Sequence, residues 1–269
     1  MKEEIVVDKS KQMTLKDIQN SELEILIYIH DFCEKHGIKY TLGEGSLIGI
    51  VRHQDFIPWD DDTDILMTRE NYNKFVELFA KETGKFRLFN YNTNPKYDKQ
   101  MFQKVVNTET IALEPNQKTN KGLGVFCDII PVDYIPDDKE KALKTCNRFW
   151  LYRRILISKT DKKISKSDMI LRILFCCFSK KHFARKLDKY AAKTKPTKHM
   201  NNLAFITHST RFLHFDASIF DEYILLPFRD RKFYVIKDYD TYLKGLFGNY
   251  MELPPEEERF SHNLDAFNK

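Results

Sequence analysis

A run of acids in front of a short apolar stretch is the feature that most constrains how this chain can fold. Four aspartates fall within five positions, namely Asp60, Asp61, Asp62 and Asp64. The stretch Ile65-Leu66-Met67 follows directly and predicts a strand over Thr63–Thr68. Side chains alternate between the two faces of a strand. Asp62 and Asp64 are therefore expected on one face, and their neighbours on the other.

Two carboxylates one strand repeat apart repel each other, and a divalent cation between them removes the repulsion. Hard carboxylate oxygens suit Mg²⁺, which takes its remaining ligands from water and from substrate phosphates. An acidic run can also cap a helix or face water, and three consecutive aspartates alone favour that interpretation. The apolar strand behind Asp62 and Asp64 favours a metal site, with Mg²⁺ as the expected ion and Mn²⁺ as its substitute.

A glycine turn precedes the acids. The sequence Gly43-Glu44-Gly45-Ser46 is predicted to open a short helix over Leu47–Arg52. Glycine lets the backbone approach closely, and the free N–H groups at a helix start suit phosphate. Alone, this pattern is typical of an ordinary tight turn. Beside a two-acid strand, it predicts a phosphotransfer site in which Gly45 and Ser46 hold phosphate and a metal ion neutralises it.

The remaining periodicity predicts a mixture of helices and strands. Helices are expected from an N-cap at Thr14 to about Gly37, over Arg69–Thr83, from Asp137 to about Ser158, and over Tyr239–Phe247 before Gly248. Strands are expected at Ile38–Leu42, Phe86–Asn90, Phe102–Asn107, Thr110–Leu113, Gly124–Ile130 before Pro131, Tyr223–Leu226 and Lys232–Ile236. An extended tail is expected from Pro254 onward.

These elements predict an α+β fold, a mixed sheet with flanking helices and a helical, basic appendage. Three segments are expected: a catalytic core over residues 1–150, a basic helical insert over 151–200, and a C-terminal segment over 201–269 that packs back on the core.

Charge is unevenly distributed along the chain. Residues 151–198 hold 15 Lys and Arg against 3 Asp, a net +12, whereas the whole chain is +5, so the rest is −7. This asymmetry indicates a polyanionic partner such as a phosphorylated substrate, an anionic lipid or nucleic acid, although solvated helix faces also carry charge runs. Within the segment, the apolar run Asp168–Phe178 predicts either a membrane-surface helix or, slightly favoured, a core helix.

Other signals place the chain in a reducing compartment. Its five cysteines form no CxxC pair, and its first residues, MKEEIVVDKSKQ, contain no apolar signal region. No stretch approaches the roughly 20 apolar residues that a membrane span needs. A cytoplasmic protein is expected, with contact at the inner membrane face as an option. The hydrolase, zinc-protease and P-loop motifs GxSxG, HExxH and GxxxxGK[ST] are absent.

Three blocks of the sequence resemble the LicD/fukutin family. They are GSLIGIVRHQDFIPWDDDTDILMTRENYNKF, GVFCDIIPVDYIPDD and YDTYLKGLFGNYMELPPEEER. The resemblance implies a nucleotidyltransferase-like fold and transfer of a substituted phosphate, typically phosphocholine or a phosphopolyol, from a CDP-activated donor to a sugar hydroxyl. It also implies a third carboxylate from a neighbouring strand, which Asp128 matches. Asp62, Asp64 and Asp128 are thus the expected catalytic and metal-binding residues.

The same resemblance implies the partners. CDP-choline is the leading donor, and the acceptor is a surface glycan such as lipopolysaccharide or teichoic acid, or a lipid-linked glycan; nucleic acid is not expected. The sequence has Phe247-Gly248-Asn249 where relatives commonly have YGD, which leaves the head group and acceptor open. Two alternatives are transfer of a nucleoside monophosphate in the same fold and a non-catalytic scaffold that binds polyanions.

Further side chains could support the site. Arg52 could hold phosphate through its planar fork or simply balance the acids. His53 could act in proton transfer, although a lone loop histidine is usually just solvated. Lys104 could neutralise phosphate or lie at a strand edge. Trp59 could stack on a base or a quaternary ammonium, although packing of its loop is favoured. His262 matches the family pattern, but no role is predicted for it.

Overall fold

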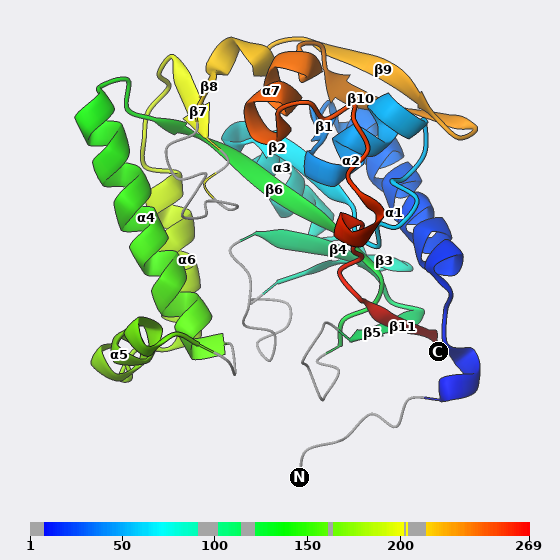
Figure 1. The fold of residues 1–269 in the computed structure, drawn as a ribbon, viewed down its shortest axis with the longest axis horizontal. Helices are drawn as coiled ribbons and strands as arrows, with labels where there is room; N and C mark the ends of the chain where they lie inside the picture. Colours follow the sequence, from blue (N-terminus) through cyan, green and yellow to red (C-terminus); the bar gives the residue numbers. More distant parts are fainter. Residues whose placement is uncertain (1–7, 91–101, 114–121, 161–163, 202, 204–213) are drawn as a thin grey trace.

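A computed structural model describes residues 8–90, 102–113, 122–160, 164–201, 203 and 214–269 (Figure 1). Its centre is a sheet with the strand order β1-β2-β6-β4-β3, extended by β7 beside β6 and β8 beside β7. Strands β2 and β6 are parallel and the other pairs antiparallel, which confirms the predicted α+β fold with a mixed sheet. The strands are β1 Thr41–Leu42, β2 Asp64–Thr68, β3 Phe86–Phe89, β4 Gln103–Asn107, β6 Phe126–Ile135, β7 His199–Asn201 and β8 Phe215–Asp216.

Helices α1 (Leu15–His36) and α3 (Arg69–Phe79) pack against this sheet and contribute to one large hydrophobic core. Thr14 caps α1 as predicted, because its hydroxyl and the Asp17 carboxylate form a reciprocal capping box. Gly37, with φ +58°, ends the helix in the left-handed conformation that glycine tolerates best. The predicted α3 is several residues too long, and the predicted first strand is shorter in the structure.

The prediction that Pro131 ends its strand is wrong, because β6 continues past it. Proline lacks an N–H and is excluded from ladder positions that need one. N–H groups alternate in direction along a strand, and that of Asp128 donates to Thr63 on the β2 side, so position 131 faces the other side. There, β4 has ended opposite Ile129, and β7 begins opposite Asp133. The missing N–H therefore falls between two partner strands.

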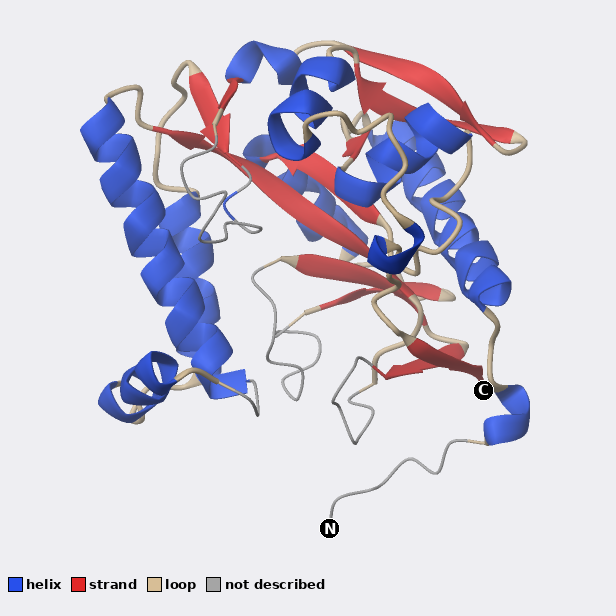
Figure 2. Ribbon diagram, viewed as in Figure 1, coloured by secondary structure: helices blue, strands red, loops and turns tan. Residues whose placement is uncertain are grey.

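Three helices form a separate layer beside the sheet (Figure 2). They are α4 Lys139–Thr160, α5 Lys166–Leu174 and α6 Lys180–Ala191. Buried side chains of α4 and α6 form a second hydrophobic cluster with Ile135 and Leu203, and Leu171 of α5 packs against it partly buried. Arg69 of α3 joins this layer to the core, because it pairs with Asp133 on β6 and with Asp188 on α6, at 2.7 Å each. The division at residues 150 and 200 stays a prediction.

The C-terminal segment returns to the core. A hairpin of β9 (Tyr223–Phe228) and β10 (Arg231–Ile236) precedes α7 (Tyr239–Phe247), which Gly248 ends at φ +65°. These elements match the prediction closely. The tail beyond Pro254 ends in a further strand that was not predicted, β11 (Asp265–Asn268), which pairs with β5 (Thr110–Leu113). This pairing fixes the tail beside the acidic run.

Candidate active site

Three charged side chains form a row across adjacent strands of the sheet. Asp64 on β2 is the register partner of Asp128 on β6, and Asp128 is the register partner of Lys104 on β4. Lys104 Nζ lies 2.7 Å from Asp128 Oδ1 and 3.3 Å from the centre of the Phe126 ring. Lys104 is buried, and β4 lies between β6 and β3, so the alternative of a strand-edge lysine is wrong.

The two predicted metal ligands lie at the start of β2. Thr63 and Ile65 are fully buried, as expected for the opposite face of the strand. The Asp62 side chain is 25% exposed, whereas Asp64 is buried. Burial, with the Asp60 charge next, raises the pKa of Asp62 to about 7. Burial and then the Asp62 charge raise the pKa of Asp64 well above its usual range. The expected repulsion between carboxylates is therefore present.

The glycine turn holds the backbone of Asp64 through hydrogen bonds to both its N–H and its carbonyl. Asp64 N–H donates to Ser46 Oγ at 2.8 Å, and Gly43 N–H donates to the Asp64 carbonyl at 2.9 Å. A Cβ at Gly43 would lie 2.4 Å from Leu66 Cγ, and one at Gly45 would lie 2.8 Å from Asp60 Oδ2. The turn thus needs glycine at position 43 in order to approach β2, and helix α2 (Glu44–Ile48) starts at this contact. Phosphate binding by Gly45 and Ser46 stays a prediction.

Arg52 and Trp59 contact the C-terminal segment. Arg52 lies in the π-helical turn η2 (Gly49–His53), and its Nη1 donates to the Tyr250 carbonyl at 2.7 Å. Its Nε donates to His53 Nε2 at 3.0 Å, and burial lowers the pKa of His53. The Arg259 guanidinium lies 5.1 Å from the centre of the Trp59 ring, which also packs on the core. The structure thus gives these side chains a packing role, and their substrate contacts stay predictions.

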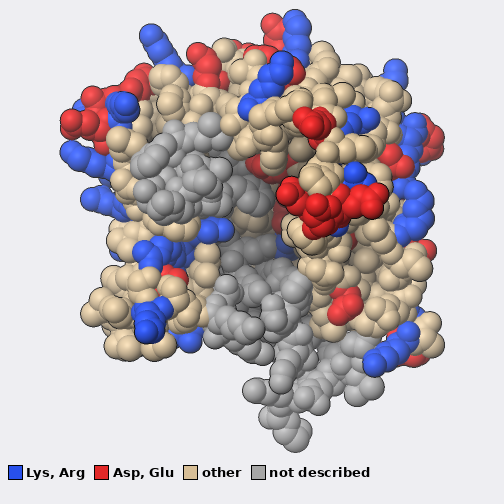
Figure 3. Space-filling model, viewed as in Figure 1, with Lys and Arg blue, Asp and Glu red and all other residues tan. Residues whose placement is uncertain are grey.

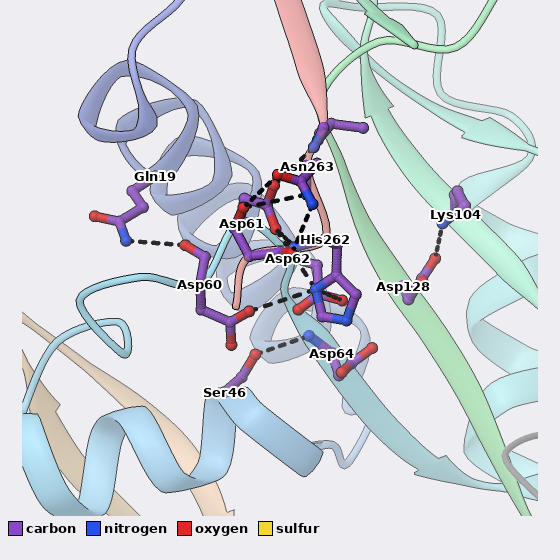
Figure 4. Close-up of polar contacts among 12 residues, drawn as sticks. Gln19, Ser46, Asp60, Asp61, Asp62, Asp64, Lys104, Asp128, His262 and Asn263 are labelled. Carbon is purple, nitrogen blue, oxygen red and sulfur yellow. Dashed lines mark hydrogen bonds and ion pairs between the residues drawn. The ribbon is translucent and has the colours of Figure 1, made fainter. Parts of the chain in front are cut away.

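A histidine with no predicted role lies against the acids (Figure 4). His262 Nδ1 is 3.3 Å from Asp62 Oδ2, 3.6 Å from Asp60 and 3.5 Å from Asp61. Hydrogen bonds to Asp60 and Asp61 raise the pKa of His262 to about 11, so the ring is cationic. The family-like pattern around His262 was the only sequence signal, because more than 190 residues separate it from the acids.

Asp61 differs from its neighbours because it binds backbone. Its two oxygens accept the N–H groups of His262 at 2.6 Å and Leu264 at 2.8 Å. Burial acts to raise the pKa of Asp61, but the hydrogen bonds from His262 and Leu264 outweigh it and leave the pKa below its usual value. Asp61 therefore anchors the C-terminal tail, and its neighbours Asp60 and Asp62 remain beside the His262 ring.

The donor set fits a hard divalent cation. Asp62, Asp64 and Asp128 offer carboxylate oxygens, which Mg²⁺ prefers. In the described part of the chain, the group whose ligand atoms come within 4.8 Å of one another is Asp60, Asp62 and His262. With no ion bound, the cationic ring of His262 lies where these carboxylates attract positive charge. Lys104 likewise places a positive charge beside Asp128.

Glu22 is a second residue that the sequence did not reveal. It lies on α1 behind Thr63 and is fully buried, and among the described residues neither of its carboxylate oxygens has a hydrogen bond of good geometry. Burial, with the charges of Asp62 and Asp60 next, raises the pKa of Glu22 well above its usual value of 4.5. The folded protein therefore keeps a proton on Glu22 to a higher pH than the unfolded chain does.

Glu22→Gln is expected to stabilise the fold at pH 8. Proton uptake by the folded state makes the contribution of Glu22 most favourable below pH 4.5, and that contribution is lost as pH rises toward the folded pKa. Each unit of the pKa difference corresponds to about 1.4 kcal/mol. Urea unfolding in EDTA at pH 5 and pH 8 should show a gain at pH 8 that shrinks at pH 5. Asp31→Asn, exposed on the same helix, serves as the control. An equal change at both pH values would contradict the protonated state.

Known proteins resemble this chain in the region that holds the predicted site. The profile of the LicD/FKTN/FKRP nucleotidyltransferase domain matches residues 37–154, a range that holds every predicted site residue. The lipopolysaccharide cholinephosphotransferase LicD of Haemophilus influenzae is 28% identical over 272 residues, 94% of this chain and 97% of that protein. Human ribitol 5-phosphate transferase FKRP is 39% identical over 57 residues, 21% of this chain and 12% of that protein. His262 lies outside the profile.

Proposed function

We propose that this chain, whose residues 37–154 match the LicD/FKTN/FKRP profile, transfers a substituted phosphate, phosphocholine first among the candidates, from a CDP-activated alcohol to a sugar hydroxyl. The named activities of LicD and FKRP share transfer of a phosphorylated alcohol, and LicD acts on lipopolysaccharide. Transfer of a phosphate-containing group is the part of this proposal that the names of both relatives support, and the name of LicD also supports a glycan acceptor. The CDP donor and the need for Mg²⁺ are its further steps.

The observation that carries the proposal is the row Asp64–Asp128–Lys104, with Asp62 at its end. Structural acidic runs face water, whereas this row lies on the three central strands with Asp64, Asp128 and Lys104 buried. Burial, and then the neighbouring carboxylates Asp62 and Asp128, raise the pKa of Asp64, and titratable groups perturbed in this way are typical of functional sites. A non-catalytic scaffold would not need to bury three charged side chains, which costs folding free energy.

Each residue of the site has a separate role in the proposed transfer. The acceptor oxygen attacks the phosphorus that bears the alcohol, the bond to the CMP oxygen breaks, and CMP leaves with the electron pair. When bound by Asp62 and Asp64, Mg²⁺ supplies neutralisation of the phosphate charge. Ser46 and Gly43 hold Asp64 in place through its backbone. Asp128 completes the metal site or accepts the hydroxyl proton, and Lys104 keeps Asp128 oriented.

The test is a donor panel with the full chain. CDP-choline, CDP-ethanolamine, CDP-glycerol and CDP-ribitol would each be incubated with Mg²⁺ and a lipopolysaccharide or teichoic acid acceptor. We expect acceptor-dependent release of CMP and a new phosphodiester in the ³¹P NMR spectrum of the glycan. Absence of acceptor-dependent CMP with every donor would reject the proposed transfer.

One observation favours a second function, because the matching profile is that of a nucleotidyltransferase domain. In that reaction the chain would add a nucleoside monophosphate to an acceptor, and pyrophosphate would leave. CTP with phosphocholine or a sugar phosphate, assayed for pyrophosphate, separates the two reactions. Pyrophosphate release without CMP release would replace the first function with the second.

A further inference from the structure

Helix α5 turns four of its apolar side chains outward, whereas Leu171 packs against the second hydrophobic cluster. Met169, Ile170, Ile173 and Leu174 recur at helical spacing, and none of the residues of α5 is buried. Ile170 is 58% exposed, and Ile173 and Leu174 are each 65% exposed. Phe178 and the two adjacent cysteines, exposed just after the helix, extend this surface. Burial of the Asp168–Phe178 run in the core, slightly favoured from sequence, is therefore wrong for this helix.

The polar side chains of α5 face the protein instead. Asp168 pairs with Arg154 of α4 at 2.7 Å, and Arg172 donates to the Ser158 carbonyl. Lys159 of α4 donates to the Phe175 carbonyl at 2.6 Å. These contacts, together with the packing of Leu171, fix the helix so that Asp168 and Arg172 meet α4 and the exposed apolar side chains meet solvent. Such an arrangement exposes a contiguous apolar patch, which marks an interaction surface.

The surroundings of this patch are basic. Residues 164–189 hold seven Lys and Arg against Asp168 and Asp188, and both acids are paired with arginines of α4 and α3. Lys166, Lys186 and Lys189 are exposed, and Figure 3 shows Lys and Arg side chains at the lower left, over the part of the helical layer that holds α5, whereas the acids of this layer gather at its upper end. An apolar face fringed by cations complements a lipid surface with anionic head groups, where each cation adds to binding.

We propose that α5 docks the protein on an anionic lipid surface, with Ile170, Ile173 and Leu174 inserted among the head groups. This inference rests on the proposed function, because a lipid-linked glycan acceptor brings the reaction to such a surface. In the described residues, no helix has the length and apolar character to cross a bilayer, so α5 lies in the plane of the interface. Asp128 lies near the start of β6, and Ile135 lies at its end, beside the helical layer; the two are about 23 Å apart at 3.3 Å per residue. The helix therefore positions the enzyme and takes no part in the chemistry.

The test is co-sedimentation of the full chain with vesicles. We expect binding to phosphatidylcholine vesicles with about 40% phosphatidylglycerol, little binding to pure phosphatidylcholine, and weakening as salt shortens the Debye length to about 3 Å at 1 M. The double variant Ile173→Ser/Leu174→Ser should bind at least about ten-fold more weakly, because two apolar side chains no longer insert. A matched control is Leu225→Ser/Leu253→Ser, which removes two exposed leucines elsewhere and should bind like the parent.

Three results would overturn the proposal. They are no binding of the parent to anionic vesicles, unchanged binding of the Ile173/Leu174 variant, and a parent dimer that this variant converts to a monomer in sedimentation velocity, which would make a second copy the occupant. Activity separates this inference from the proposed function. The variant should keep CMP release on a soluble acceptor, and absence of CMP release with every donor in the parent would count against the reaction alone.

Discussion

Asp62→Ala and Asp64→Ala are expected to abolish Mg²⁺-dependent transfer and to leave the fold intact. Each removes a buried or half-buried carboxylate from a cluster in which neighbouring charges raise the pKa values, so repulsion falls. The melting temperature without metal should therefore stay level or rise. Release of CMP at saturating donor, over a range of Mg²⁺ concentrations, measures the loss. Full activity in either variant would remove these residues from the site.

Asp61→Asn is the matched control for this prediction, because it changes the adjacent aspartate. Asp61 accepts two backbone N–H groups from the tail, so the loss of its charge weakens those hydrogen bonds. Hydrogen bonds to charged groups contribute about 1.5–3 kcal/mol, and we expect a lower melting temperature by a few degrees with partial activity. A stable, inactive Asp61→Asn variant would contradict the separation of anchor from ligand.

Asp128→Asn is expected to lower the transfer rate by about 10²-fold or more, a typical contribution of a general base. Asparagine keeps the shape of the side chain and can still contact Lys104 Nζ, but it loses charge and basicity. The dependence of the residual rate on pH and on Mg²⁺ separates the two roles left open for Asp128. A base predicts loss of a pH-dependent limb, and a ligand predicts a raised requirement for Mg²⁺.

Lys104→Met gives the companion measurement. It leaves Asp128 in place and removes the buried cation that contacts it at 2.7 Å. Removal of one partner of a buried pair costs about 3–5 kcal/mol, so the unfolding free energy should fall even where activity persists. A rate for Asp128→Asn within a few-fold of the parent would make the Asp128–Lys104 pair structural.

Local patterns of sequence determined most of the secondary structure. Three predicted boundaries appear in the structure within a residue or two of their predicted positions. They are the N-cap of α1 at Thr14, the start of β2 at Asp64 and the end of α7 at Gly248. These signals depend on hydrogen bonds and periodicity within a few residues, and they need no knowledge of distant contacts. The resemblance to the family supplied Asp128, which spacing alone would not have identified.

Tertiary structure decided which residues meet. His262 reaches the acids because β11 pairs with β5 and because Asp61 accepts the N–H of His262. This hydrogen bond joins residues that are more than 190 positions apart in the sequence. Lys104 is a central, buried cation because β4 lies between β6 and β3. Helix α5 shows the same limit, since its periodicity gave an apolar face but not the direction of that face. Pairing of strands and docking of helices are set by long-range packing, and a local pattern holds no information about its partner.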